Sequence, residues 1–269
     1  MNLDPPNRHT PINSSTSSGE AVEQRFVGKA AVVTGAASGI GRAVAQRLGA
    51  EGAEVACLDV NAESAMETAA GIGPNAIGLA CDVSDWNTVE STIATITEKF
   101  GQIDVLCNVA GIGGFAESHL IDPAVYARMI AINLTGTFLM CRAVLPQMVE
   151  RGHGVIINTA STAGIMGQPW SAGYCSSKAG VVGLTKALAT EYDTPIRINA
   201  VSPGGVVTNM YAAFMPPEGV DWNRMRKMSR DNVETAQPEE LASLFAYLGS
   251  DEARYITGSI MVMDGGITA

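Results

Sequence analysis

The sequence has few histidines and no Cys-x-x-Cys pair. Only three histidines occur among 269 residues, and the five cysteines, an odd number, stand apart at positions 57, 81, 107, 141 and 175. This spacing fits neither a zinc site nor a disulfide framework. We therefore expect no metal site, and free cysteines in a reducing, cytoplasmic location.

Positive charge and long apolar runs are also scarce. Lysine and arginine total 17 against 27 acidic residues, which gives a net charge of −10. Nucleic acids and anionic membranes attract basic surfaces, so neither is expected as a partner. The sequence also lacks the run of about 18 unbroken apolar residues that a membrane span requires.

The chain is long enough for one large α/β domain with a sizeable core. Residues 1–25 are rich in proline, serine, asparagine and threonine and lack the apolar region of a secretory signal. We interpret them as a flexible N-terminal tail, although a segment that covers a neighbouring subunit is an alternative. Residues 26–269 are predicted to form a single domain.

Short apolar runs alternate with helical periodicity from Lys29 onward, which predicts a three-layer, doubly wound Rossmann fold with a seven-stranded parallel sheet. The expected strands are Ala30–Thr34, Glu54–Leu58, Ala76–Ala80, Ile103–Asn108, Val155–Thr159, Ile196–Ser202 and Ser259–Val262. The expected helices are Arg42–Leu48, Ala62–Ala70, Thr88–Phe100, Leu134–Val149, Ala179–Glu191 and Glu239–Leu248. Ser84-Asp85 and Gln237-Pro238 are plausible helix starts.

The stretch 204–237 has no clear periodicity, and a connection of this length is usually a lid or a binding loop. In doubly wound sheets, ligands bind beyond the carboxyl ends of the strands. The glycine-rich segment 34–41, Asp59, Asn108 and Ser161 all follow such ends. We therefore expect one site at this edge.

The glycine-rich segment Thr34-Gly35-Ala36-Ala37-Ser38-Gly39-Ile40-Gly41 follows the first expected strand. Its glycine spacing, four and then two, differs from the G-x-G-x-x-G fingerprint. Glycines at a helix start still let phosphate oxygens approach the backbone amides and the positive end of the helix dipole. An ordinary glycine-rich turn is the alternative, but Asp59 follows at the distance expected of a dinucleotide site.

Asp59 closes the second strand, 18 residues after Gly41. A carboxylate there can accept hydrogen bonds from both adenosine ribose hydroxyls, whereas a ribose phosphate would meet like charge. This favours NAD over NADP. The alternative is a cap for the helix that starts near Asn61.

Tyr174 stands four residues before Lys178 and thirteen after Ser161. Residues four apart share a helix face, and a neighbouring cation favours the phenolate, so Tyr174 is expected to exchange a proton near neutral pH. That is chemistry for interconverting alcohols and carbonyls. Taken singly, Ser161 could cap a turn and the Tyr/Lys pair could be a solvated helix face.

These motifs resemble those of the short-chain dehydrogenase/reductase family over about Phe26 to Gly266. The matching segments are Thr34-Gly35-x-x-x-Gly39-x-Gly41, Cys81-Asp82-Val83, Asn108-Val109-Ala110-Gly111, Ile132-Asn133-Leu134, Ser161, Tyr174-x-x-x-Lys178, Asn199-x-x-x-Pro203-Gly204 and Asp264-Gly265-Gly266.

The resemblance implies a catalytic set of four residues. Ser161 binds the substrate oxygen, Tyr174 passes the proton, Lys178 lowers the pKa of Tyr174 and holds the nicotinamide ribose, and Asn133 completes the set through a water-linked relay. Taken singly, Asn133 could instead satisfy backbone groups inside a helix. The expected cofactor-binding residues are Gly35, Ser38, Gly39, Ile40, Gly41, Asp59, Asp82, Val83, Asn108, Gly111, Tyr174, Lys178, Pro203, Gly204, Val206 and Thr208.

Among these, Asp82 and Val83 are expected at the adenine, Asn108 and Gly111 on the adenosine side, and Val206 and Thr208 at the nicotinamide amide. The chain has Val109 where the family usually has a second asparagine. Relatives that prefer NADP often place a basic residue just before the middle glycine, where this chain has Ser38.

Cys175 and the three histidines are not expected to be catalytic. Cys175 has no histidine near it in sequence, His9 lies in the tail, and His119 and His153 are expected in exposed turns. The substrate pocket is expected among loop residues that are mostly apolar, although packing in the core or against a partner is an equal alternative. They are Phe115, Thr162, Ile165, Met166, Gln168, Trp170, Met210, Tyr211, Phe214, Met215, Trp222, Met225 and Met228.

The sequence therefore predicts an NAD-dependent oxidoreductase that transfers a hydride between nicotinamide and a secondary alcohol or ketone, with an apolar or alicyclic substrate. A 3-oxoacyl carrier-protein reductase is the alternative within this class, and an NAD-sensing binding protein is the alternative outside it. The resemblance also implies a homotetramer, with Ile260–Met263 in a subunit contact.

Overall fold

The computed structural model describes residues 23–192, 196–228 and 234–269. In this part of the chain seven parallel strands form one sheet in the order β3-β2-β1-β4-β5-β6-β7, and helices cover both faces. The predicted doubly wound α/β fold is therefore confirmed. Nearly all of the predicted tail, residues 1–22, lies outside the described residues.

The strands are β1 (Ala30–Thr34), β2 (Glu54–Asp59), β3 (Ala76–Ala80), β4 (Val105–Asn108), β5 (Gly154–Thr159), β6 (Ile196–Pro203) and β7 (Ile260–Met263). The α-helices are α1 (Gly39–Ala50), α2 (Ala62–Ile72), α3 (Trp86–Phe100), α4 (Pro123–Ile130), α5 (Thr137–Arg151), α6 (Ala172–Glu191) and α7 (Pro238–Gly249). Shorter turns are the π-helical η1 (Ala131–Gly136) and the 3₁₀-helical η2 (Thr162–Gly164), η3 (Asn209–Ala213), η4 (Trp222–Met228) and η5 (Asp251–Ala253).

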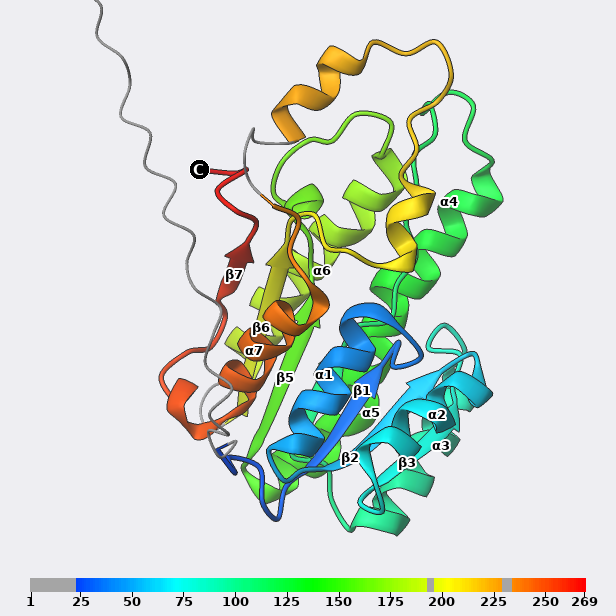
Figure 1. The fold of residues 1–269 in the computed structure, drawn as a ribbon. Coiled ribbons are helices and arrows are strands. Elements are labelled where there is room, and N and C mark those ends of the chain that lie inside the picture. Colours follow the sequence, from blue (N-terminus) through cyan, green and yellow to red (C-terminus); the bar gives the residue numbers. More distant parts are fainter. Residues whose placement is uncertain (1–22, 193–195, 229–233) are drawn as a thin grey trace, which may run out of the picture.

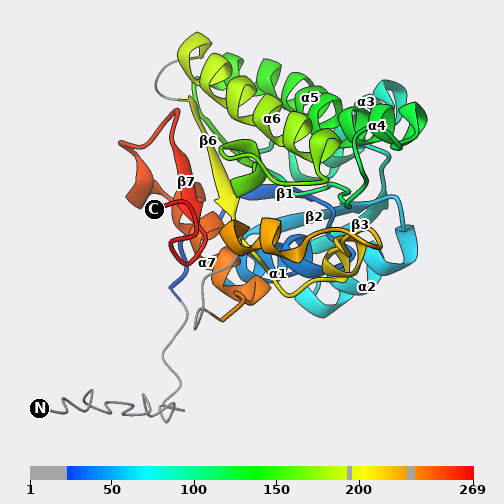
Figure 2. The same cartoon turned by 90° about the horizontal axis from the view of Figure 1, so that it is seen from above.

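The sheet is the middle of three layers (Figures 1 and 2). On one face Val33 and Ile157 pack with the buried side chains of α1 and α7. On the other face Val32 and Ile156 pack with those of α3, α5 and α6. Since the central strands are buried on both faces, they are continuous apolar runs rather than alternating ones.

The strands point the same way, so their carboxyl ends meet at one edge. β1, β2, β4 and β5 end at Thr34, Asp59, Asn108 and Thr159. Figure 1 shows the segment after β6, coloured yellow and orange, beyond the tips of the strands. This segment contains η3 and η4 and is tied back by a bridge between Val206 and Ala236. It occupies the position expected of a binding loop.

Three helical features differ from the prediction. α6 begins at Ala172, seven residues before the predicted start at Ala179, because tertiary packing overrides the low helix propensity of its glycine- and serine-rich first turns. α4 was not predicted, although Pro123 stands in its first turn and Asp122 caps it by accepting a 2.8 Å bond from Ala124 N. The predicted helix that starts at Leu134 is continuous with α4 through η1.

The helical stretch 123–151 is long and apolar enough for a membrane span by length and composition, with a mean hydropathy of 1.4 over its most apolar 18 residues. Its inner face carries Met140, Val144 and Met148, which are fully buried in the core beside the sheet. A helix that covers a parallel sheet requires such a face. Packing within this domain therefore accounts for the apolar composition.

The folded contacts begin just before the predicted domain boundary. Arg25 Nε lies 2.6 Å from Glu51 Oε2, and Arg25 Nη1 lies 2.9 Å from Glu252 Oε2. Glu51 is only 1% exposed, and Arg47 also pairs with it. A buried carboxylate needs such partners, so Arg25 is part of the folded domain.

Candidate active site

The turn between β1 and α1 requires glycine at two positions. Gly35 has a φ of +69°, and a Cβ atom on it would stand 2.8 Å from Ala110 Cα. A Cβ atom on Gly41 would stand 2.1 Å from the carbonyl oxygen of Gly35. The turn therefore folds back on the start of α1 and packs against the loop after β4. Backbone amides at such a helix start favour a phosphate group.

Thr34 links this turn to the end of β4. Its Oγ1 accepts hydrogen bonds of 3.0 Å from the backbone amides of Val109 and Ala110. Val109 replaces the asparagine that is usual in the family, but the contact uses only its backbone. The replacement therefore leaves the link between β1 and β4 in place.

Asp59 lies beside the glycine turn, as predicted. Its Oδ2 accepts a bond of 3.1 Å from Ala37 N, and its Oδ1 accepts one of 3.0 Å from Asn61 N. Asn61 itself caps α2 by accepting a bond of 3.1 Å from Ser64 N. The capping role considered for Asp59 therefore belongs to Asn61, and the carboxylate of Asp59 is held against the turn.

The side chain of Asn108 points into the protein, not toward the edge of the sheet. Its Nδ2 donates to Asn158 Oδ1 at 2.9 Å and to Cys141 Sγ at 3.4 Å. Its backbone carbonyl accepts a bond of 2.7 Å from Thr159 Oγ1. These bonds tie β4 to β5. The amide of Asn108 therefore has a structural role, and the expected place of Asn108 on the adenosine side stays a prediction.

Asp82 and Val83 follow β3 at the same edge. Asp82 is exposed and accepts a bond of 2.9 Å from Ser84 N. Val83 is buried, and a Cβ atom placed on Gly136 of η1 would stand 2.7 Å from its Cγ2. Asp82 is thus accessible to a ligand, whereas the side chain of Val83 packs against the π-helical turn.

The loop after β6 closes onto the glycine turn. Pro203 ends β6, and Gly204 N donates a bond of 2.9 Å to Met263 O. Val206 is buried, and a Cβ atom placed on Gly39 would stand 3.0 Å from Thr208 Cγ2. The loop after β6 is therefore in contact with the glycine turn at Gly39.

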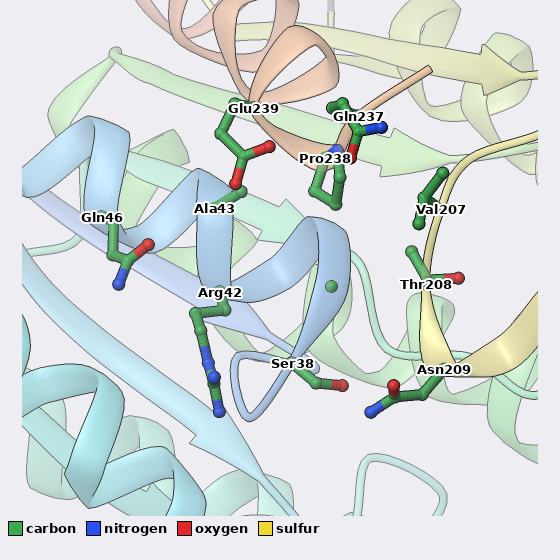
Figure 3. Close-up of a pocket in the computed structure, with 11 residues that line it drawn as sticks. Ser38, Arg42, Ala43, Gln46, Val207, Thr208, Asn209, Gln237, Pro238 and Glu239 are labelled. Carbon is green, nitrogen blue, oxygen red and sulfur yellow. The ribbon is translucent and has the colours of Figure 1, made fainter. Parts of the chain in front are cut away.

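A cavity of about 330 Å³ lies along the outer side of this contact (Figure 3). It opens between the start of α1, the loop after β6 and the start of α7, and Figure 3 shows Ser38 and Asn209 turned toward one another across it. Three predicted cofactor residues, Ser38, Gly39 and Thr208, line it. The cavity therefore flanks the predicted phosphate position.

Ser161, Tyr174 and Lys178 come together at the ends of β5 and α6. The hydroxyl of Ser161 lies near enough to that of Tyr174 to lower its pKa. Lys178 is only 4% exposed, and its Nζ donates a bond of 2.7 Å to Thr159 O. The same nitrogen lies 5.8 Å from the centre of the Tyr174 ring. The predicted trio is therefore one cluster.

Ser161 also has the structural role that was considered as an alternative. Its Oγ accepts a bond of 3.2 Å from Ala163 N and so caps η2. A hydroxyl has one donor and two acceptor positions, so this cap leaves capacity for Tyr174 and a substrate oxygen. The two roles are compatible.

The pKa of Tyr174 differs from the expectation. Burial raises the pKa of this phenol to about 12, and the bond from Ser161 opposes the shift without cancelling it. Burial lowers the pKa of Lys178 to about 8. In the protein alone the expected acidic tyrosine is therefore absent, because desolvation disfavours both charged forms.

Asn133 lies in η1, and its side chain is fully buried. Its Oδ1 accepts a bond of 2.8 Å from Ile112 N, and its Nδ2 donates to Ile112 O at 2.8 Å and to Ser177 Oγ at 3.0 Å. A π-helical turn within a longer helix often marks a functional site. The sequence motif located Asn133 but did not identify Ser177, whose only signal was its place between Tyr174 and Lys178.

Gly111 and Gly113 bring the loop after β4 onto this cluster. A Cβ atom on Gly111 would stand 3.2 Å from Asn133 Oδ1 and 3.6 Å from Lys178 Nζ. A Cβ atom on Gly113 would stand 3.1 Å from Tyr174 Cε2. The absence of side chains here lets the loop approach the polar groups closely.

Three predicted pocket residues form an aromatic cluster beside Tyr174. The ring of Phe214 lies edge-on to Tyr174 and to Phe115, with both centroid distances 5.1 Å. Phe115 meets Trp170 at 6.2 Å. Trp170 has a φ of +57°, a left-handed conformation that is strained for a bulky residue. The loops after β4, β5 and β6 each contribute one ring.

The other predicted pocket residues differ in how far they are buried. Thr162 is buried, Met166, Gln168, Met210, Met225 and Met228 are partly buried, and Ile165 and Met215 are exposed. The side chains of Tyr211 and Trp222 lie outside the described residues. His119 and His153 are exposed, as expected. Cys175 is partly buried, with its Sγ 4.0 Å from Gln168 O.

Comparison with known proteins agrees with this geometry. The family described as "Enoyl-(Acyl carrier protein) reductase" matches residues 35–268. D-threitol dehydrogenase of Mycolicibacterium smegmatis is 40% identical over 91% of this chain and 94% of its own. A 2,5-dichloro-2,5-cyclohexadiene-1,4-diol dehydrogenase of Sphingobium indicum is 37% identical over 90% of this chain and 97% of its own.

A solved structure of 3-ketoacyl-(acyl-carrier-protein) reductase from Brucella melitensis, complexed with NADH, superposes with a TM-score of 0.82. Its sequence is 34% identical to this one, and the match covers 90% of this chain and 99% of the other chain. The relatives are named as dehydrogenases and reductases, and the likeness extends over the whole described fold. The chain is therefore an oxidoreductase that belongs to the short-chain dehydrogenase/reductase family.

Proposed function

We propose that the protein is an NAD-dependent dehydrogenase that interconverts a secondary alcohol and a ketone, with Tyr174 as the group that exchanges the proton. The observation that carries this proposal is the cluster of Ser161, Tyr174 and Lys178 at the same edge of the sheet as the glycine turn. The turn at Gly35 and Gly41 and the carboxylate of Asp59 suit a dinucleotide in shape and in hydrogen-bonding capacity.

A nicotinamide bound at this edge supplies the acceptor of a hydride in alcohol oxidation and the donor in ketone reduction. Ser161 would bind the substrate oxygen, and the Tyr174 phenolate would accept the hydroxyl proton as the carbonyl forms. Lys178 and the positive charge of the oxidised ring both favour the phenolate. Burial opposes the phenolate, so these two positive charges would be needed to favour the proton-accepting form.

We infer a preference for NAD over NADP from charge and geometry. Asp59 would repel a 2′-phosphate, and Ser38 supplies no cation at the position before the middle glycine. Arg42 is a basic residue in the first turn of α1, and its Nη2 donates a hydrogen bond to the carbonyl of Ala37. That bond holds its guanidinium on the turn. The other cofactor-binding residues expected from the family motifs are proposed on the basis of those motifs.

The aromatic cluster supports an apolar or alicyclic substrate. Phe115, Trp170 and Phe214 present ring edges and faces next to Tyr174, and such surfaces bind hydrocarbon rings better than charged chains. A 3-oxoacyl carrier-protein reductase is the second candidate, since a protein of that name has the same fold. Acceptance of an acetoacetyl thioester with NADPH would favour it.

We also infer a homotetramer. Its support, apart from family resemblance, is that β7 is an edge strand with its Val262 45% exposed, and natural edges of this kind are usually covered. Sedimentation velocity at micromolar concentration tests this, and a stable monomer would contradict it. The cytoplasmic location inferred from the cysteines stays a prediction.

A panel of alcohols tests the central proposal. Purified protein is incubated with NAD or NADP and linear, alicyclic and polyhydroxylated secondary alcohols, and absorbance near 340 nm is followed. We expect reduction of NAD with at least one alicyclic alcohol and slower reduction of NADP. No turnover with any alcohol, together with measurable NADH binding, would instead favour an NAD-sensing protein.

A further inference from the structure

Ser177 is a fully buried serine on α6, between Tyr174 and Lys178. Its Oγ donates a hydrogen bond of 2.8 Å to the backbone carbonyl of Tyr174 and accepts one of 3.0 Å from Asn133 Nδ2. Its hydroxyl proton and one of its lone pairs are therefore engaged within the protein. One hydroxyl thus connects the helix of the tyrosine to the π-helical turn of the asparagine.

The amide of Asn133 extends this connection to the loop after β4. It forms one bond with each backbone polar group of Ile112, both 2.8 Å, and gives its second hydrogen to Ser177. Both amide hydrogens are then used, so the side chain cannot donate to a ligand. Its geometry is that of a brace between the loop at Ile112 and α6.

The first turn of α6 has little local stabilisation of its own. It contains Gly173, and two serines follow at once, residues with low helix propensity, while its N-cap residue Ser171 forms no side-chain capping bond. The Oγ of Ser171 is buried without a hydrogen-bond partner. The turn that carries Tyr174 is therefore held by contacts such as the hydrogen bond between Ser177 and Asn133, because it has no side-chain cap.

We propose that Ser177 is a positioning residue: through Asn133 it fixes the first two turns of α6, and with them Tyr174 and Lys178, relative to the loop at Ile112. The role of Ser177 in catalysis rests on the proposed function of Tyr174. Ser177 itself does not touch the substrate, because its hydroxyl is occupied and buried. Misplacement of a catalytic group by about 1 Å can cost on the order of 100-fold in rate.

The test compares two adjacent serines of the same helix. Ser177→Ala removes the bridge, while Ser176→Ala removes an exposed hydroxyl that bonds only to the carbonyl of Ala172, at 2.7 Å. We expect Ser177→Ala to lower kcat about 10-fold or more with little change in the KM for NAD. Ser176→Ala should leave both constants unchanged. Ser177→Thr, which keeps the hydroxyl, should recover most of the lost kcat.

A double-mutant cycle separates positioning from general stability. If Ser177 acts through Asn133, the change Ser177→Ala should cost less than about twofold in kcat in an Asn133→Ala background. Wild-type kcat in folded Ser177→Ala, or independent and additive losses in the cycle, would overturn the proposal. Ser177→Cys, close in size but weak in hydrogen bonding, replaces Ser177→Ala in these comparisons if the alanine variant fails to fold.

Amide hydrogen exchange gives a readout that does not need turnover. Amides 173–178 should exchange about 10-fold faster in the Ser177→Ala protein than in wild type and Ser176→Ala. If wild type oxidises no alcohol, the proposed function fails, while exchange still decides whether Ser177 holds this turn. Unchanged exchange in folded Ser177→Ala would overturn the positioning role whether or not the enzyme is active.

Discussion

Lys178 Nζ donates a hydrogen bond of 2.7 Å to the backbone carbonyl of Thr159, at the end of β5. This bond fixes the ammonium group 5.8 Å from the centre of the Tyr174 ring. A lysine has three donor hydrogens, so two remain for other partners, such as a ribose hydroxyl. The strand end thus sets where the positive charge lies relative to the phenol.

Removal of this ammonium should impair chemistry. In Lys178→Met the phenolate of Tyr174 loses the nearest cation, so we expect kcat for alcohol oxidation to fall about 100-fold, within the range of general acid–base effects. Lys186→Met, on an exposed position of the same helix, is the control and should behave like wild type. Steady-state kinetics with NAD measures both, and a Lys178→Met enzyme with normal kcat would argue against this role.

Charge at Asp59 should set the cofactor preference. Asp59→Asn keeps the size of the side chain but removes the charge, so the KM for NAD should rise about 10-fold and that for NADP should fall. Glu63→Gln makes the same change of charge at an exposed position in the first turn of α2 and should change neither constant. An unchanged ratio of kcat/KM for the two cofactors in Asp59→Asn would remove the electrostatic argument.

The ring of Phe214 should control which substrates fit. Phe214→Ala deletes an aromatic side chain next to Tyr174, and burial of such a group contributes about 1.5–3 kcal/mol. The KM for a cyclohexanol-type substrate should therefore rise about 10-fold or more. The kcat/KM for bulkier ring alcohols should rise relative to that for the cyclohexanol-type substrate. Met215→Ala alters a neighbour that is 66% exposed and should have no such effect. Equal KM values for all three proteins would place the substrate elsewhere.

The raised pKa of Tyr174 has a measurable consequence for the protein without cofactor. Burial raises this pKa to about 12, above the ordinary value near 10 of an unfolded chain. Between these two pH values the folded protein binds more protons than the unfolded chain. The contribution of Tyr174 to the free energy of unfolding is therefore complete below pH 10 and is lost as the pH rises toward 12. Ultraviolet titration of tyrosinate should show a late transition that Tyr174→Phe removes.

Bound NAD should lower the pH at which Tyr174 titrates, because the positively charged nicotinamide ring favours the phenolate. Titration of the NAD complex, with NADH as the uncharged control, measures the shift. A transition of Tyr174 at the same pH in all three states would contradict the proton-exchange scheme.

The fold followed from the sequence because its strands are buried on both faces and so appear as short apolar runs, such as Ala30–Thr34, which the structure reproduces. The start of α6 did not, since glycine and serine before Lys178 have low helix propensity and tertiary contacts order them. The partner of Asn108 was equally hidden, because a motif shows where a residue stands but not that its amide bonds to Asn158.

The polar cluster was predicted with mixed success. Spacing placed Tyr174 and Lys178 on one helix face, and the glycine turn placed Asp59 beside it. The pKa of Tyr174 was wrong for the protein alone, because the desolvation that raises it depends on packing around the ring, which the sequence does not encode locally. Ser177 was missed because its importance comes from Asn133, which is 44 residues away in the chain.

The most direct test of the account is the Tyr174→Phe variant, which removes one oxygen atom and keeps the ring that packs against Phe214. Its kcat with NAD and the best alcohol is compared with wild type, and NADH binding is followed by fluorescence. We predict a loss of about 1,000-fold or more in kcat with NADH affinity retained. Turnover close to that of wild type would show that the proton passes through another group.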